Sequence, residues 1–141
     1  MNETPINLTL GLERVYGPRP AWPLAIEAAH AQLALLRQLA PSVYEPALGC
    51  AVEAVYDERA RPNRYGFLGV HRQWAFERRF GVEDSPEVTL AFLTCRHLRD
   101  LLGADHYQRV MSVAWEVSRC EQQAGAARMG ARSHALVGGP S

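Results

Sequence analysis

The sequence predicts a mainly α fold: a single compact bundle of about five helices, with a candidate short β-strand near the N-terminus. Apolar residues recur at helical spacing along most of the chain, and prolines and glycines separate these segments. The length of 141 residues and the 48% hydrophobic content fit one globular domain. We therefore expect a helical domain over residues 1–124. A flexible tail is expected over 125–141, where small residues dominate and the periodicity fades.

The N-terminal region contains the one candidate strand. Residues 6–12 alternate apolar and other side chains with a period of two, which is typical of a strand. Glycine and proline then break the chain over residues 17–20. The first helix is expected over about residues 23–40, because Pro23 is tolerated in a first helical turn and Pro41 cannot continue a helix. Its apolar residues cover a broad arc, which predicts a core helix with a narrow exposed stripe.

The middle of the chain is less clearly patterned. Pro46 is expected to open a second helix over about residues 46–57, and the polar residues 58–66 are expected to form a loop. Over 67–80 the apolar and basic residues are spread around the whole helical wheel. We expect a helix there, while a short strand over 65–70 followed by a helix over 71–80 fits the pattern nearly as well.

The last two helices have clear start and stop signals. Ser85 is expected to cap a helix whose first turn contains a proline and an acid. This helix should reach Leu102, and Gly103 provides its C-terminal exit. Asp105 is then expected to cap an amphipathic helix that ends near Gln123.

All fifteen basic residues of the chain are arginines, and there is no lysine. This excludes a P-loop lysine and Schiff-base catalysis, both of which need a lysine amine. Arginine keeps its charge at physiological pH and binds carboxylates, phosphates and aromatic faces. Fifteen acids balance the fifteen arginines. A GC-rich coding sequence, as in a bacterium or a mobile element, would also favour arginine and alanine, but codon bias does not decide where the charge lies.

The sequence gives no sign of export, membrane insertion or a bound cofactor. No signal peptide and no long apolar stretch is present, so we expect a cytoplasmic protein with no membrane partner. Cys50, Cys95 and Cys120 are odd in number and contain no CxxC motif, which disfavours disulfides and a zinc site. We expect all three to be small buried apolar side chains, and we expect no cofactor and no metal.

Residues 59–80 form the strongest candidate binding region, which we call the arginine patch. Six arginines lie there against the single acid Glu77, interleaved with five aromatic residues. Arginine and aromatic side chains are enriched at protein interfaces, and they also contact the phosphates and unpaired bases of nucleic acids. The candidate partner-binding residues are Arg59, Arg61, Arg64, Tyr65, Arg72, Trp74, Arg78 and Arg79.

We expect a small regulatory module, adaptor-like or inhibitor-like, that binds another protein through this patch. A nucleic-acid-binding domain that uses the same patch is the first alternative, and an outer solvated face over an aromatic core is another. An enzyme with an unrecognised site is the third, with His97 and Asp100, or Asp105 and His106, as its candidate acid–base pairs. No catalytic motif is found, so no residue is assigned a catalytic role, and a homo-oligomer stays open.

Overall fold

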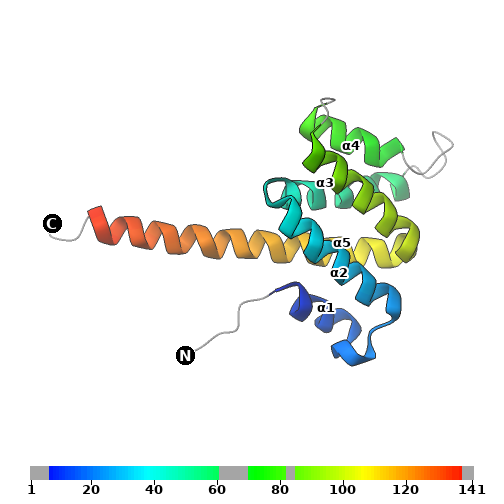
Figure 1. The fold of residues 1–141 in the computed structure, drawn as a ribbon, viewed down its shortest axis with the longest axis horizontal. Coiled ribbons are helices and arrows are strands. Elements are labelled where there is room, and N and C mark those ends of the chain that lie inside the picture. Colours follow the sequence, from blue (N-terminus) through cyan, green and yellow to red (C-terminus); the bar gives the residue numbers. More distant parts are fainter. Residues whose placement is uncertain (1–6, 61–69, 82–84, 138–141) are drawn as a thin grey trace.

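The computed structural model describes residues 7–60, 70–81 and 85–137, with side chains for 7–59, 75–81 and 85–124. Every regular element in these residues is helical, which confirms the predicted mainly α bundle (Figure 1). The elements are α1 (Leu8–Tyr16), the 3₁₀ turn η1 (Arg19–Ala21), α2 (Leu24–Leu39), α3 (Pro41–Ala60), α4 (Val70–Phe80) and α5 (Pro86–Val137).

The candidate N-terminal strand over 6–12 is wrong, because residues from Leu8 onward form α1. The side chain of Asn7 accepts a hydrogen bond from the Leu10 amide at 2.9 Å and caps the helix. Leu8 and Leu12 stand four residues apart and therefore share a helical face that packs on the core. The alternation of apolar residues over 6–12 is thus compatible with a short helix as well as with a strand. The cap at Asn7 and the packing of Leu8 and Leu12 on the core favour the helix.

The predicted first helix is confirmed as α2, but its buried face is narrower than expected. Its buried residues follow a spacing of three, four and three: Ile26, Ala29, Leu33 and Leu36. Three leucines that the sequence pattern placed in the core are exposed instead: Leu24, Leu35 and Leu39. Leu35 and Leu39 remain exposed although they lie beside α5, where they line an open groove.

Helix α3 begins five residues earlier than predicted. Pro41 ends α2, as expected, but it also opens α3 directly, since a proline is well suited to a first helical position. Pro46 consequently lies inside the helix instead of at its start. Residues 58–60, which were expected to begin a loop over 58–66, form the last turn of α3 instead. Residues 61–66 lie outside the described residues. The helix expected over 71–80 is confirmed as α4. Residues 65–69, for which a strand and a helix were both considered, lie outside the described residues.

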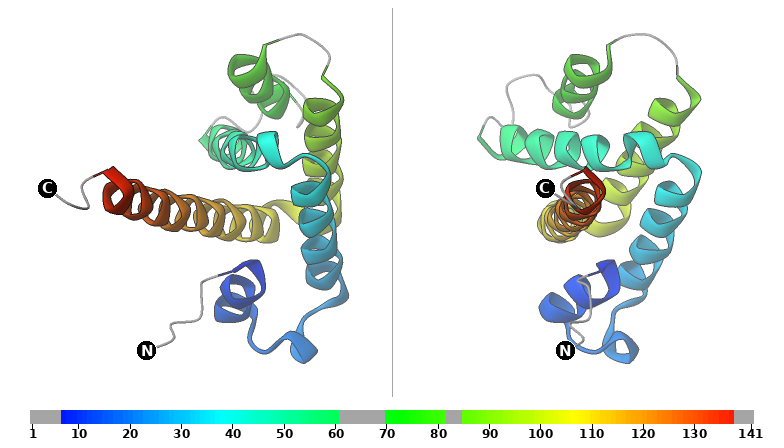
Figure 2. Two further views of the ribbon diagram at one scale, coloured as in Figure 1. Left: turned by 60° about the vertical axis from the view of Figure 1, so that its left-hand side comes forward. Right: turned by 90° about the vertical axis from the view of Figure 1, so that its left-hand side faces the viewer.

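Helix α5 consists of two helical halves that meet at Gly103, which has a φ of 75° and a ψ of 167°. This glycine confirms the predicted exit, because L side chains rarely adopt such a conformation. The second half continues past Gln123 to Val137, and its C-terminal end extends away from the other helices (Figures 1 and 2). The first part of the predicted tail is therefore helical, while its flexibility stays a prediction.

The core lies where α3 packs on both α4 and α5, and α2 and α1 cover other sides of α5 (Figure 2). Its largest fully buried side chains come from all of these helices except α4, which contributes the nearly buried Phe76. Phe76 packs edge-on against Phe92, with ring centroids 5.4 Å apart. No helix in the described ranges combines the length and apolarity that a membrane span would need.

Candidate partner-binding groove

Three of the eight predicted binding residues have described side chains: Arg59, Arg78 and Arg79. The first lies in the last turn of α3, and the other two lie in the last turn of α4. Arg59 lines a different concave surface from the one that the pair on α4 lines. Of the remaining candidates, Arg72 and Trp74 lie on α4 with side chains outside the described ones, and Arg61, Arg64 and Tyr65 lie outside the described residues.

Arg78 and Arg79 line an open groove of about 640 Å³ between α3, α4 and the second half of α5. We call this the α3–α4–α5 groove. It combines two guanidinium groups, two carboxylates and two aromatic side chains with an apolar floor. The other lining residues are Glu45, Pro46, Gly49, Cys50, Val52, Glu53, Tyr56, Ala75 and Trp115.

Trp115 is fixed at one side of the groove by contacts with α3. Its indole N–H donates to the carboxylate of Glu45 at 2.9 Å. A Cβ at Gly49 would lie 3.1 Å from Trp115 Nε1, so the glycine lets the indole approach the helix closely. The guanidinium of Arg119 lies 4.9 Å from the indole ring centre, which is a cation–π distance. The half-buried indole thus has a fixed orientation and a charged neighbour.

Arg78 lies between two carboxylates of α3. Its guanidinium is 2.6 Å from Glu53 and 3.9 Å from Asp57, and the side chain remains 62% exposed. Exposed ion pairs contribute little to stability because water and salt screen them. Their effect here is to hold the guanidinium beside the groove and to balance part of the positive charge of the arginine patch.

Arg59 belongs to a second surface, formed by α1, α3 and α5. It forms an ion pair with Asp105, and its hydrogen bond is the main cause that lowers the pKa of this carboxyl. His106 instead forms a hydrogen bond with the Tyr16 hydroxyl at 2.9 Å. The two members of the candidate pair Asp105 and His106 therefore contact different partners.

The cysteines are free thiols with different environments. Cys50 and Cys95 are buried, as predicted, whereas Cys120 is exposed, so that part of the prediction is wrong. The Cys50 thiol lies 3.6 Å from the Ala75 carbonyl oxygen and links α3 to α4 at the groove floor. Burial raises the pKa of this thiol to about 11, so it stays protonated and is a poor nucleophile at neutral pH.

Several groove residues were not found by sequence reasoning. Trp115 is one of them, and it stands four residues before Arg119, a spacing that places the two side chains on the same helical face. Glu45, Gly49 and Tyr56 carry no local signal, because the contacts that make them part of a groove join helices distant in the sequence.

Comparisons with protein-family models, with curated proteins and with solved structures find no match for this chain. In the described part of the chain, no group of three or more histidine, cysteine or acidic residues is arranged to hold a metal ion.

Proposed function

We propose that this chain is a helical protein-interaction module that binds a partner protein through the α3–α4–α5 groove. The observation that carries the proposal is the presence of Arg78, Arg79, Tyr56 and Trp115 in one open concave surface. Arginine, tyrosine and tryptophan are the residue types most enriched among those that dominate binding energy at protein interfaces.

The geometry of these side chains also favours a binding role. The Tyr56 side chain is 57% exposed, so much of its apolar area is available to a partner. Trp115 is held by Glu45 and by its close approach to Gly49, so little side-chain freedom is lost when a partner packs on it. Such an anchor binds at a lower entropic cost than a free surface side chain.

The charge of the groove favours a protein over a nucleic acid. Glu45 and Glu53 line the same surface as the two arginines, and Arg78 already contacts Glu53. A phosphate backbone would meet these carboxylates as well as the guanidinium groups, whereas a protein surface can present charges of both signs.

The free thiols of Cys50, Cys95 and Cys120 accord with a cytoplasmic location, where thiols remain reduced.

The test is affinity capture from an extract of the source organism, with the purified chain as bait. We expect a partner protein that is retained by the wild type and lost by the double variant Arg78→Glu/Arg79→Glu. Loss of two interface arginines should weaken binding by about 30-fold or more. Both side chains are exposed, so the variant should fold normally.

The matched control is Arg14→Glu, which reverses an exposed arginine on α1, outside the groove. Capture that survives the double variant, or that is lost equally in the control, would contradict the proposal. Capture that nuclease treatment abolishes, and that weakens steeply with salt, would support the nucleic-acid alternative instead.

A further inference from the structure

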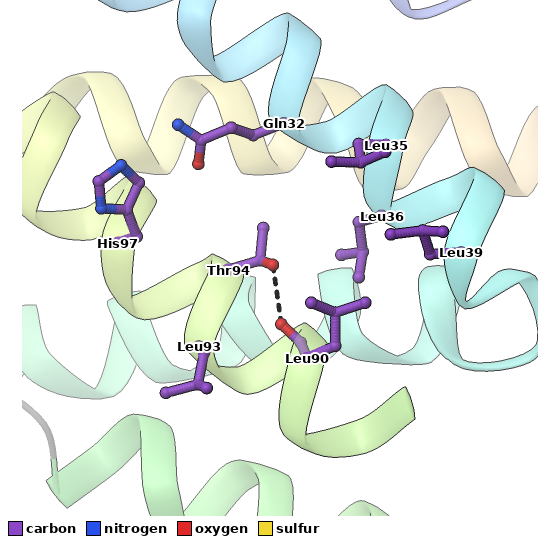
Figure 3. A pocket seen from close by; sticks show the side chains of 8 residues that line it. All are labelled: Gln32, Leu35, Leu36, Leu39, Leu90, Leu93, Thr94 and His97. Atoms are coloured by element: carbon purple, nitrogen blue, oxygen red, sulfur yellow. Dashed lines mark hydrogen bonds between the residues drawn. The ribbon is translucent and has the colours of Figure 1, made fainter. Parts of the chain in front are cut away.

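A second concave surface lies on a different side of the molecule, between α2 and the first half of α5. It is an apolar groove of about 290 Å³, and Figure 3 shows the leucines of both helices around it. Leu35, Leu39 and Leu93 are 53%, 56% and 51% exposed. We call this surface the leucine groove. Its lining residues are Gln32, Leu35, Leu36, Leu39, Leu90, Leu93, Thr94 and His97.

The outer face of α5 beside this groove has an order of side chains that is complementary to itself. Along the helix come Leu93, Arg96, His97, Asp100 and Leu101, all of them exposed. Read in the opposite direction, the order is again leucine, charge, histidine, charge, leucine, with the two charges exchanged. Two copies of this helix packed antiparallel would therefore place leucine against leucine and arginine beside aspartate.

One two-fold axis serves all of these contacts. With the axis beside His97, Leu93 of one copy faces Leu101 of the other, and the reverse contact follows by symmetry. Arg96 of each copy then lies about two residues from the position opposite Asp100 of the other copy, a displacement of roughly 3 Å along the helix. Side chains as long as arginine reach across such a distance.

The charged residues of this face are available for such a contact. Neither Arg96 nor Asp100 forms an ion pair or hydrogen bond with any other described residue. Their neighbour on the helix, Arg99, differs in this respect, because it points to the other side and binds Glu58. The exposed pair thus has no partner within the described part of the chain.

We propose that the leucine groove and this face of α5 are covered by a second copy of the chain in an antiparallel, two-fold symmetric dimer. Leu35 and Leu39 extend the apolar contact onto α2, and the charges of Arg96 and Asp100 fix the register. The charge complementarity of the face with itself is what selects a second copy over an unrelated partner. The dimer goes beyond the proposed partner binding, because the two grooves share no lining residue.

The test uses the purified full chain and measures its mass by sedimentation velocity over a range of concentrations. We expect the wild type to dimerise reversibly. Arg96→Asp makes the face wholly acidic and Asp100→Arg makes it wholly basic, so each variant alone should self-associate about tenfold more weakly or worse. An equimolar mixture of the two should restore the dimer, because every charged contact is then between opposite signs.

Variants of leucine separate the apolar contribution from general surface effects. Leu93→Ser should weaken the dimer, whereas the matched control Leu24→Ser should not. Leu24 is 88% exposed on the same helix as the groove residues Leu35 and Leu39, and it lies eight residues from the nearest lining residue of α2, about 12 Å along the axis. Unfolding midpoints equal to that of the wild type would show that these variants fold.

A wild type that remains monomeric at the highest concentrations would overturn the proposal. So would a dimer that both charge variants leave intact, or a mixture that stays as weak as its components. Because the readout requires no other protein, its failure is distinguishable from failure of the proposed partner binding. Arg78→Glu/Arg79→Glu should leave the dimer unchanged.

Discussion

Gly11 lies where α1 packs closely against α5. A Cβ at this position would lie 2.8 Å from Val113 Cγ1 and 3.0 Å from Val117 Cγ2, both shorter than ordinary van der Waals contact. Valine side chains in a helix have one strongly preferred rotamer, so neither can easily turn away. The packing of α1 on the bundle therefore depends on the absence of a side chain at Gly11.

We expect Gly11→Ala to destabilise the protein by about 1–2 kcal/mol. Overpacking costs about 1–3 kcal/mol, and the better helix propensity of alanine offsets about 1 kcal/mol of this. Chemical denaturation measures the change in the free energy of unfolding. Val113→Ala removes the closest contacting atom, so the double variant should be more stable than the sum of the two single effects predicts. A stabilising effect of Gly11→Ala would show that α1 does not pack as described.

Residue patterns along the sequence predicted the arginines of the candidate site but not the contacts that form its groove. The density of arginine over 59–80 marked Arg78 and Arg79, which line the groove. The contact of Glu45 with Trp115 joins residues 70 positions apart, and a pattern along the chain carries no information about such a pair. Local composition thus indicates which side chains are unusual, whereas the shape of the groove depends on helix packing.

At the scale of elements, the sequence was most informative where the ends of helices have distinctive chemistry. Pro86 and Gly103 marked the limits of the first half of α5, because proline is favoured at the first position of a helix and a glycine with positive φ is favoured at its C-terminal end. Pro46 misled the prediction, since proline is favoured at helix starts but is also tolerated here inside α3. The N-terminal helix was missed because one apolar alternation is compatible with both periods over so few residues.

Gly103 sets the direction of the second half of α5 relative to the first. Its φ of 75° and ψ of 167° lie in a region that is nearly restricted to glycine, and nothing approaches the position of a Cβ within 4 Å. We expect Gly103→Ala to lower the free energy of unfolding by about 1–3 kcal/mol through backbone strain alone. Thermal unfolding of this variant measures the effect.

The control for this change is Gln122→Ala, an exposed position in the same helix that should change stability little. A Gly103→Ala protein as stable as the control would mean that α5 can straighten through this position. Packing of the second half of α5 on α1 and α3 would then contribute less than its buried residues, such as Tyr107 and Met111, suggest.

For the whole molecule, the two proposed surfaces combine into one arrangement. The leucine groove lies between α2 and the first half of α5, and the α3–α4–α5 groove involves the second half of α5. A dimer formed through the leucine groove therefore leaves the α3–α4–α5 groove open on each copy. Such a dimer would carry two partner sites and would bind a partner that is itself multivalent more tightly than a single site does.

The end of α5 extends beyond the helices that cover the rest of the core (Figure 1). Its sequence contains Gly125 and Gly130, and each glycine in a helix interior costs roughly 1 kcal/mol relative to alanine. A helical segment of this length without tertiary packing is marginal in water. Residues 125–137 should therefore open and close as helix without affecting the bundle.

We therefore expect a chain that ends at Ala124 to keep its fold. The free energy of unfolding should change by less than about 0.5 kcal/mol, because no described core residue follows Val117. Circular dichroism should show a smaller helical signal but the same unfolding midpoint, and amide exchange in the full chain should be fast over 125–137. Slow exchange there, or a lower midpoint for the shortened chain, would mean that the extension packs on the bundle or on a second copy. The domain would then end beyond residue 124.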